Sequence, residues 1–369
     1  MAEVFFVAGE ASGDLHASGV AAELRKIRPE LKLGGIGGPR LAAEGVELIE
    51  TYDQLAVMGL TEVIRHIPRH YALLKRVRAR LRSGEIRLLI LIDYPGFNMR
   101  LAESAKAAGV PVLYYVTPQV WAWGAKRLPK LARIVTRAAV ILPFEEQLLR
   151  GYGIDAHFVG HPLLDGWDRL PTRDAARAVL GIDKDARVLV LYPGSRVQEI
   201  VRHIEPFVKA ARALQKKHPD LQVIISAAPA TEHGYSNMPY PVVAAPALTM
   251  FSAADVALCK SGTTTLEAAI AGCPMVVAYR VGKLSYAIAR RMVKISHIGL
   301  VNIVAGREVA REFVQGALDP EAVARSLDAL LTDSELRRRT IEDLAEVRAK
   351  LGTPGASARV ARMASELVA

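Results

Sequence analysis

The sequence predicts an α/β protein with parallel sheets, divided into two domains. Short runs rich in Val, Ile and Leu alternate with amphipathic stretches of helical length, and this alternation is typical of parallel strands joined by right-handed crossovers. The runs are apolar throughout, as expected of strands that are buried on both faces. The chain has 369 residues, which exceeds the roughly 250–300 residues at which one core usually divides.

The expected elements follow this pattern along the whole chain. In the first half, strands are expected at residues 4–8, 32–35, 88–92, 112–116, 140–142 and 156–159, and helices at 15–28 and 98–108. In the second half, strands are expected at 188–192, 223–227, 256–259 and 275–279, and helices at 198–217, 248–253 and 263–271. A last helix is expected at 356–367, because Val360, Met363 and Leu367 are spaced to form one buried stripe.

A domain boundary is expected near residues 160–166, between a strand and the helix start at Pro171-Thr-Arg-Asp. The first domain then comprises residues 1–165 and the second residues 166–345. Residues 346–369 hold the C-terminal helix. We expect this helix either to cross back to the first domain or to be swapped with a partner chain, which would make a homodimer.

The composition is that of a globular enzyme in a reducing compartment. The sequence is 51% hydrophobic and 23% charged, which is ordinary for such proteins. Cys259 and Cys273 stand outside any metal-type cluster, and we interpret them as buried thiols, which indicates the cytoplasm. We expect no signal peptide, because the sequence passes directly into a strand. No apolar run approaches the roughly 18 residues of a membrane span.

The net charge is +10, and two blocks of basic residues lie in the first half of the sequence. Residues 63–84 contain seven Lys and Arg residues and no acid, and residues 104–144 contain six more and again no acid. Such blocks suit nucleic acid, an anionic lipid surface or a phosphorylated substrate, or they are simply solvated helix faces. The sequence carries no nucleic-acid-binding motif, which argues against nucleic acid as a partner.

Polar residues that follow the strands are the candidates for a site, because open parallel sheets bind ligands at the carboxyl ends of their strands. The loop after residues 4–8 contains Glu10, Asp14 and His16; it is either a substrate loop or a plain turn that Asp14 caps. Asp93 follows the run 88–92, where partial burial would raise its pKa toward that of a general base. Asn98 is the better candidate to cap the next helix, which leaves Asp93 for chemistry.

Two segments in the second half form a candidate anion site. Gly194, Ser195 and Arg196 follow the strand at 188–192, and an Arg guanidinium suits two phosphate oxygens. Gly262, Thr263 and Thr264 lie where a helix begins, and free backbone N–H groups there bind phosphate. Glu267 follows one turn later and could accept hydrogen bonds from sugar hydroxyls. The alternative is a capping box between Thr264 and Glu267 with no ligand.

Other near-motifs have little support. The glycine-rich segment 34–40 does not fit the dinucleotide-binding template, and the sequence contains no phosphate-binding P-loop. Asp183-Lys-Asp185 lies in a turn before a strand, at the wrong end of the sheet for a metal site. We therefore expect neither a metal nor a cofactor.

Ten segments in chain order resemble the lipid-A-disaccharide synthase family, over most of the chain to about residue 315. They are AGEASGD at 8–14, GGPR at 37–40, AVMGLTEV at 56–63, IDYPGFN at 92–98, YVTPQVWAW at 115–123, LPFE at 142–145, VGH at 159–161, PGSR at 193–196, SGT with LE at 261–267, and VNIVAGRE at 301–308. The set as a whole is highly specific, whereas the tail carries little signature.

The resemblance implies the GT-B architecture, in which two Rossmann-like domains face each other across a cleft, and an inverting, metal-independent glycosyl transfer. The implied donor is UDP-2,3-diacylglucosamine, and the implied acceptor is 2,3-diacylglucosamine 1-phosphate, which attacks through its 6-hydroxyl. The products are the β-1,6-linked disaccharide 1-phosphate and UDP.

The resemblance also implies roles for individual residues. Asp93 corresponds to the catalytic base, with Glu10 and His16 as its neighbours. Arg196 corresponds to the arginine of the diphosphate site, and Asn302 to an asparagine of the nucleotide site. The family often has a second acid three residues after the base, where this chain has Gly96.

Because the implied substrates are acylated, the basic segment at residues 60–82 is a candidate for contact with lipid. Apolar residues recur at helical spacing from Leu60 to Leu81, with a break expected at Pro68 and basic residues between them. We expect a lipid face comprising Met58, Leu60, Val63, Ile64, Ile67, Arg76, Arg78 and Arg80. Such a face would hold the protein at the cytoplasmic side of the inner membrane, at about 1 kcal/mol for each basic residue near the anionic surface.

Two other interpretations of the sequence stay open. One is another UDP-sugar enzyme of the same fold, such as a peptidoglycan-type N-acetylglucosaminyltransferase or a UDP-sugar 2-epimerase. The other is a non-catalytic lipid-binding protein at the membrane surface. The placement of Asp93 and Arg196 directly after strands argues against the second.

Overall fold

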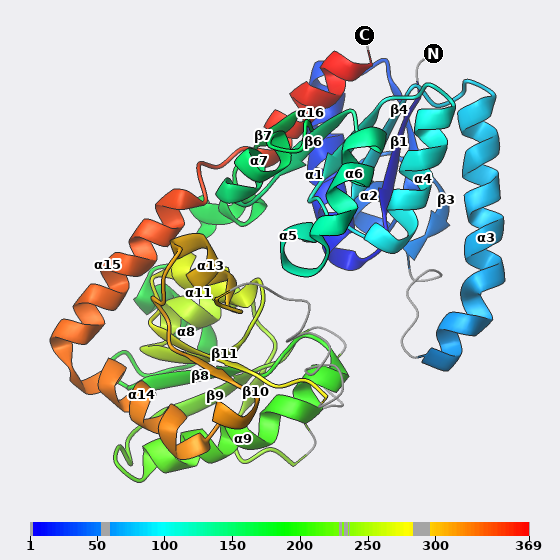
Figure 1. Ribbon diagram of the computed structural model, residues 1–369. Coiled ribbons are helices and arrows are strands. Elements are labelled where there is room, and N and C mark those ends of the chain that lie inside the picture. The colour runs from blue at the N-terminus through cyan, green and yellow to red at the C-terminus, as the bar shows by residue number, and fades with distance from the viewer. Residues whose placement is uncertain are drawn as a thin grey trace. The chain divides into compact units, whose positions relative to one another are not determined.

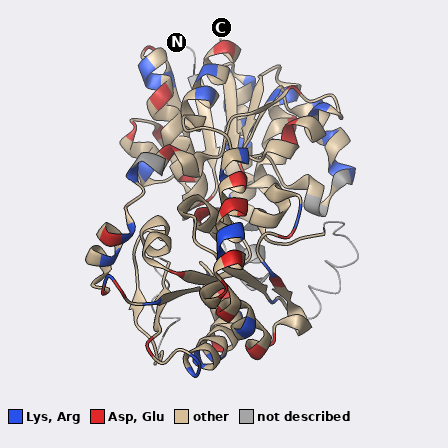
Figure 2. Cartoon of the chain, turned by 90° about the vertical axis from the view of Figure 1, so that its left-hand side faces the viewer, with Lys and Arg blue, Asp and Glu red and all other residues tan. Residues whose placement is uncertain are grey.

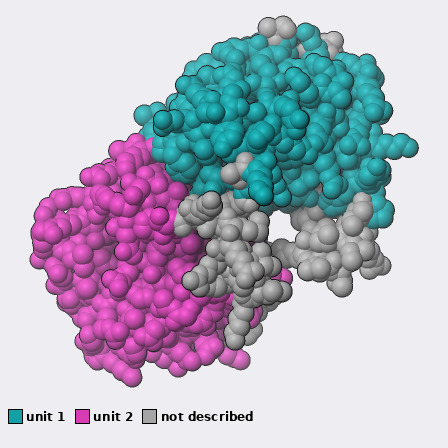
Figure 3. Space-filling model, viewed as in Figure 1, with its two compact units in different colours: residues 1–165, 352–369 teal, residues 166–351 magenta. Residues whose placement is uncertain are grey.

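A computed structural model of the chain describes residues 3–52, 60–228, 231, 235, 237–282 and 296–368. The chain folds into two compact units, each built on its own parallel sheet (Figures 1 and 3). Unit 1 combines residues 1–165 with residues 352–369, and unit 2 comprises residues 166–351.

The sheet of unit 1 has the strand order β3-β2-β1-β4-β5-β6-β7, and all its strand pairs are parallel. Its strands are β1 (Glu3–Ala8), β2 (Lys32–Gly37), β3 (Glu47–Thr51), β4 (Leu88–Ile92), β5 (Val112–Tyr115), β6 (Arg137–Val140) and β7 (Ala156–Phe158). Its helices are α1 (Ala11–Ile27), α2 (Pro39–Ala43), α3 (Leu60–Arg82), α4 (Pro95–Ala107), α5 (Val120–Trp123), α6 (Leu128–Ile134), α7 (Pro143–Arg150) and α16 (Ala356–Leu367).

The sheet of unit 2 has the order β10-β9-β8-β11-β12-β13 and is also parallel. Its strands are β8 (Val188–Tyr192), β9 (Gln222–Ser226), β10 (Val242–Val243), β11 (Val256–Lys260), β12 (Met275–Tyr279) and β13 (Glu312–Val314). Its helices are α8 (Arg173–Leu180), α9 (Val197–Gln215), α10 (Ala247–Ala253), α11 (Thr264–Ala271), α13 (Leu300–Ala305), α14 (Pro320–Thr332) and α15 (Ser334–Lys350).

The central strands are apolar throughout because helices cover both faces of the sheet. In unit 1, α3, α4 and α6 pack on one face, and α1 and α16 pack on the other. Phe5 and Val7 of β1 point to the first group, whereas Val4 and Phe6 point to the second. The expected strands at 88–92, 188–192 and 275–279 are confirmed residue for residue.

Two helices begin earlier than expected, which changes the role of two polar residues. Helix α1 begins at Ala11, so Asp14 is a buried residue of its first turn and not its cap. The Asp14 carboxylate instead accepts hydrogen bonds from the N–H groups of Gly38, Arg40 and Leu41 at the start of α2. Helix α4 begins at Pro95, since proline suits the first helical position, and the prediction of Asn98 as its cap is therefore wrong.

The last helix completes unit 1. Val360, Ala361 and Ala364 of α16 are buried in the core that α1 shares. Asp165 accepts hydrogen bonds from the N–H groups of Gly355 (2.7 Å) and Ala356 (3.1 Å), where α16 begins.

The chain leaves unit 1 and returns to it at nearly the same place. Gly352 has φ +88°, and a Cβ atom there would lie 3.2 Å from the Cα of Gly160. Only glycine fits such a position, because both the backbone conformation and the neighbouring backbone exclude a side chain.

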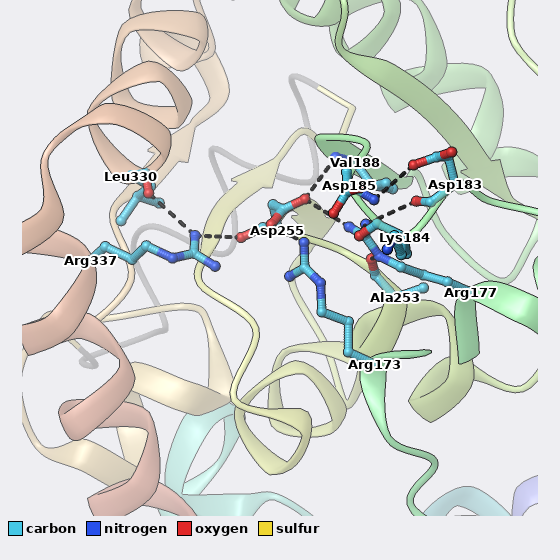
Figure 4. A network of polar contacts seen from close by, with 10 residues as sticks. All are labelled: Arg173, Arg177, Asp183, Lys184, Asp185, Val188, Ala253, Asp255, Leu330 and Arg337. Carbon is cyan, nitrogen blue, oxygen red and sulfur yellow. Dashed lines mark hydrogen bonds and ion pairs between the residues drawn. The ribbon is translucent and has the colours of Figure 1, made fainter. Parts of the chain in front are cut away.

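A polar network joins the amino-terminal ends of β8 and β11 in unit 2 (Figure 4). The Asp255 carboxylate binds Arg177 (3.0 Å), Arg173 (2.7 Å) and the N–H of Val188 (2.9 Å). Arg177 is only 1% exposed and also donates to the carbonyls of residues 183, 184 and 253. The turn at 183–185 therefore serves this network, at the end of the sheet opposite to the candidate anion site.

Helix α15 carries acidic and basic side chains along its exposed face (Figure 2). Arg338 pairs with Glu335 and Glu342 within the helix. Solvent screens such exposed pairs, so they contribute little to stability.

Candidate functional site

The carboxyl ends of β1 and β4 bring two predicted loops together in unit 1. The two strands are neighbours in register, with Ala8 opposite Ile92, so Gly9 and Glu10 lie beside Asp93 and Tyr94. A Cβ atom on Gly9 would lie 2.2 Å from the Cγ of Tyr94. The tyrosine ring therefore packs directly against the glycine backbone, and no other residue fits at position 9.

Asp93 and Tyr94 both have left-handed backbone conformations, with φ of 45° and 46°. For residues other than glycine, such a conformation costs about 1–3 kcal/mol each and tends to occur at functional sites. The surroundings hold it in place. The Asp93 carbonyl accepts hydrogen bonds from Asn98 Nδ2 and Tyr114 Oη, both at 2.8 Å, and the Asp93 N–H donates to the carbonyl of Tyr115.

Sequence reasoning missed two residues near Asp93. Tyr94 Oη lies 3.0 Å from His70 Nε2, and both rings contact Phe97. Burial, together with the negative charge of Glu10, raises the pKa of Tyr94. Tyr94 directly follows Asp93, and His70 reaches this edge of the sheet through the Tyr94 hydroxyl. Tyr94 could have been found from the sequence, because it stands between Asp93 and a proline directly after a strand. No sequence pattern marks His70.

His16 lies on α1 and contacts the strand next to β4. It lies in the second turn of α1, and its ring packs edge to face against Tyr115 at 6.0 Å. Burial lowers the pKa of His16 more than the charges of Asp165 and Glu10 raise it. The imidazole is therefore neutral at physiological pH, and its predicted place in catalysis stays a prediction.

In unit 2, the carboxyl ends of β8 and β11 are neighbours, with Tyr192 opposite Cys259. Gly194 has φ +145°, and a Cβ atom there would lie 2.5 Å from the Cβ of Glu199. Ser195 and Arg196 are exposed, and Arg196 is the N-cap residue of α9. The Ser195 N–H donates to Glu199 Oε2 at 3.1 Å.

The second segment begins α11 without a side-chain cap. The N-cap residue is Thr263, whose side chain makes no capping hydrogen bond. The alternative of a capping box between Thr264 and Glu267 is therefore wrong, because Thr264 is already inside the helix. Gly262 has φ +151°, a conformation that favours glycine. No described side chain caps the first N–H groups of α11, and such N–H groups at the start of a helix bind anions.

Glu267 has the features of a ligand-binding carboxylate. Burial raises its pKa from 4.5 to about 7. In the described part of the chain, no hydrogen bond or ion pair satisfies this carboxylate. A half-buried carboxylate without a partner is costly, so a hydrogen-bond donor from a ligand is the natural complement.

Asn302 is used by the fold itself. Its side chain is fully buried, and Nδ2 donates to the carbonyl of Ala310 (2.6 Å) and to Glu312 (2.8 Å). Its Oδ1 accepts from the N–H groups of Val309 and Ala310. These bonds fix the loop between α13 and β13, and a direct contact between Asn302 and a nucleotide stays a prediction.

Three polar residues of unit 2 were also missed. Glu199 and His203 lie one turn apart on α9, and Lys260 is the last residue of β11. Lys260 Nζ binds Glu199 Oε1 at 2.8 Å, and His203 Nε2 accepts the N–H of Arg280 at 2.8 Å. The signal was present for Lys260, which directly precedes the segment that begins at Ser261.

Helix α3 differs from the expected lipid face. It runs continuously through Pro68, so the expected break is absent. Leu74, Val77 and Leu81 are buried in the core of unit 1, and the apolar stripe there faces the sheet instead of lipid. Met58 and the side chains of Leu60, Val63, Ile64 and Ile67 lie outside the described residues.

The three arginines of the predicted lipid face are not equivalent. Arg78 donates to Ser104 Oγ (2.8 Å), and Arg80 donates to Glu85 (3.1 Å), so both are tied to unit 1. Arg76 is exposed, as are Lys75 and Arg82.

Three further findings concern the described residues as a set. They contain no group of three or more His, Cys, Asp or Glu side chains that could hold a metal ion. None of their helices is long and apolar enough to cross a membrane. Cys259 and Cys273 are both free and buried.

Comparisons with known proteins agree with this geometry. A family model described as lipid-A-disaccharide synthetase matches residues 4–366. The lipid-A-disaccharide synthase of Syntrophotalea carbinolica is 41% identical over 372 residues, covering 99% of this chain and 95% of that protein.

Two solved structures show the fold. The UDP-GlcNAc 2-epimerase of Neisseria meningitidis, solved with UDP-GlcNAc, has a TM-score of 0.63 at 13% identity, covering 99% of this chain and 98% of that chain. The calicheamicin glycosyltransferase CalG4 has a TM-score of 0.64 at 17% identity, covering 100% and 98%. The two parallel sheets therefore belong to the GT-B class, which glycosyltransferases and epimerases share.

Proposed function

Because the chain belongs to the lipid-A-disaccharide synthetase family, we propose a division of its reaction between the two sites described above. The enzyme condenses UDP-2,3-diacylglucosamine with 2,3-diacylglucosamine 1-phosphate, and it forms the β-1,6-linked lipid A disaccharide 1-phosphate and UDP.

The UDP donor binds at the carboxyl edge of the unit 2 sheet. Its diphosphate lies against Arg196 and the N–H groups at the start of α11, with Ser195 beside it. The ribose hydroxyls donate hydrogen bonds to Glu267, for whose carboxylate the described residues provide no partner. Support comes from the adjacency of β8 and β11 and from the uncapped N-terminus of α11. Fixed donors stabilise the charge that develops on the leaving UDP, so no metal is required.

The acceptor binds at the carboxyl edge of the unit 1 sheet. Asp93 removes the proton of the 6-hydroxyl as this oxygen attacks the anomeric carbon of the donor sugar. A single displacement inverts that carbon. Glu10 and Tyr94 orient the acceptor beside Asp93, and His70 holds the Tyr94 hydroxyl. The strained pair Asp93–Tyr94 is the observation that carries this assignment, because backbone strain of this kind tends to be kept at functional sites.

Product formation by an Asp93→Asn variant tests the assignment. Asparagine tolerates the left-handed conformation, so the backbone should persist without the base. Radiolabelled acceptor and UDP donor are incubated with each protein, and the disaccharide is separated by chromatography. We expect the rate to fall about a hundredfold or more, with UDP affinity unchanged. An undiminished rate would remove Asp93 from the role of base, and no disaccharide from the parent enzyme would overturn the proposed reaction.

We also propose that the enzyme works as a peripheral protein at the cytoplasmic face of the inner membrane. The exposed residues Lys75, Arg76 and Arg82 of α3 support this, because an anionic surface attracts each of them by about 1 kcal/mol. Replacing all three by glutamine should weaken binding to vesicles containing anionic lipid about a hundredfold in low salt. Replacing Arg78, which is bound to Ser104, is the control. Equal binding by the triple variant would leave α3 a solvated face.

A further inference from the structure

An ion pair joins the two loops that are proposed to hold the donor diphosphate. Lys260 Nζ lies 2.8 Å from Glu199 Oε1, and Glu199 Oε2 accepts the N–H of Ser195 at 3.1 Å. Lys260 ends β11, directly before the start of α11, whereas Glu199 lies in the first turn of α9, after β8. The pair therefore lies at the carboxyl edge of the sheet, where ligands of open α/β sheets bind.

The ammonium is held in a defined position. It lies 5.8 Å from the centroid of the Tyr279 ring, within the range of a cation–π interaction. A Cβ atom on Gly262 would lie 3.6 Å from Nζ, so the ammonium lies next to the backbone that leads into α11. Glu199 is the one hydrogen-bond acceptor that the described residues offer to this ammonium, which has three donors.

The Glu199 carboxylate occupies an anion position. Its two oxygens take a backbone N–H and an ammonium, which is what a phosphate oxygen would take. Burial raises the pKa of Glu199, but Lys260, the N–H of Ser195 and the charge of Arg196 together outweigh burial, so this pKa lies below its ordinary value. The carboxylate is thus ionised, and the Lys260 ammonium lies next to a negative charge like that of a phosphate oxygen.

The pair differs from an ordinary surface salt bridge on the same helix. The side chains of Lys260 and Glu199 are only 20% and 18% exposed, whereas those of Lys209 and Glu205 are 59% and 73% exposed. A screened surface pair stabilises a protein very little. A partly desolvated ammonium beside free N–H groups interacts much more strongly with a phosphate.

On the basis of the proposed function, we propose that Lys260 is a binding residue for a phosphate of the UDP donor, and that Glu199 is the positioning residue that aims it. When the donor binds, the ammonium donates to a phosphate oxygen with the N–H donors that Glu199 does not use. Lys260 then adds a positive charge to that of Arg196 as UDP leaves. Lys260 therefore contributes to recognition of the diphosphate and makes no contact with the nucleoside.

Binding calorimetry with UDP and with uridine tests the proposal on five proteins: the parent, Lys260→Met, Lys260→Arg, Glu199→Gln and the control Lys209→Met. For Lys260→Met we expect UDP affinity to fall about tenfold, the loss of one charged hydrogen bond, and uridine affinity to stay the same. Glu199→Gln keeps a side-chain oxygen that can accept from the ammonium and hold it in place, and it removes the negative charge that competes with the phosphate, so this variant should bind UDP at least as tightly as the parent. Lys260→Arg should recover most of the UDP affinity, and the control should match the parent.

The outcomes separate the alternatives. If the pair is merely structural, Lys260→Met and Glu199→Gln will weaken UDP and uridine alike, and the proposal is wrong. If Lys260→Met binds UDP within twofold of the parent, the proposal is also wrong, although the donor site stands because the parent still binds UDP. If the parent itself binds no UDP, the proposed donor site fails and this inference fails with it. Thermal unfolding of each variant checks that all the proteins are folded at the temperature of the binding measurements.

Discussion

Replacing Glu267 by glutamine should make the protein more stable in alkaline solution and weaker in binding UDP. Burial raises the pKa of the Glu267 carboxyl from 4.5 to about 7, and the described residues supply no cation or hydrogen bond to oppose this. Above pH 7 the folded protein therefore holds a buried negative charge that the unfolded chain exposes to water. A neutral amide of the same shape removes that cost.

The magnitude follows from the two pKa values. A difference of about 2.5 pKa units corresponds to about 3 kcal/mol at most. The sign is fixed because the folded-state pKa lies above the unfolded one. The destabilisation is absent below pH 4.5, grows between pH 4.5 and about 7, and is constant above. Between pH 5 and pH 8 the advantage of the glutamine variant should grow by about 2 kcal/mol.

Urea unfolding at pH 5 and pH 8 measures this difference for parent and variant. Glu335→Gln is the matched control, because hydrogen bonds from Arg338 and Arg339 lower the pKa of Glu335 to about 2. That variant should gain nothing as the pH rises. A Glu267→Gln advantage that is equal at the two pH values, or a parent that is the more stable protein at pH 8, would refute the reasoning.

The same variant separates a ligand-binding carboxylate from a structural one. If ribose hydroxyls donate to Glu267, their binding favours the ionised form, and UDP binding near pH 7 should release protons. Calorimetry in buffers of different ionisation enthalpy detects this release in the parent. It should be missing in Glu267→Gln, together with part of the affinity.

Two further predictions concern the unit 1 site and the polar network of unit 2. Gly9→Ala would place a methyl group 2.2 Å from the Tyr94 ring, so the ring must move. Disaccharide formation should then fall roughly tenfold or more, whereas UDP affinity, measured by calorimetry, should stay the same. A fully active variant would show that the position of the Tyr94 ring does not matter for the reaction. Arg177→Met removes the donors of four acceptors from a buried place and should cost about 3 kcal/mol or more in urea unfolding. Arg173→Met, which removes an exposed partner of Asp255, should cost at most about 1 kcal/mol, and equal costs would contradict the assignment.

The strands were predictable because they are buried on both faces. A parallel strand such as β4, with all five residues buried, must be apolar throughout, and its run of Leu and Ile is visible in the sequence. Helix starts were less predictable. Ala11 and Pro95 begin α1 and α4 without a side-chain cap, so the signals for Asp14 and Asn98 pointed to the wrong positions.

The site was predictable where it follows directly from a strand end. Asp93, Ser195 and Gly262 each lie within three residues of a buried strand, so their place at the carboxyl edge follows from topology alone. The left-handed conformation of Asp93 was not predictable, because it depends on hydrogen bonds from Asn98 and Tyr114 to one carbonyl. The pairing of Lys260 with Glu199 joins residues 61 positions apart, and no local pattern encodes such a contact.

The division of unit 1 into residues 1–165 and 352–369 has a consequence for biosynthesis. The ribosome completes unit 2 before it releases helix α16, so the α1 face that α16 covers in the core stays open to water while nearly half of the chain is made. Unit 2 is thus an insertion in unit 1. The two segments of unit 1 that flank it lie close together, because Gly352 approaches Gly160. Synthesis of unit 1 therefore starts before that of unit 2 and is completed after it.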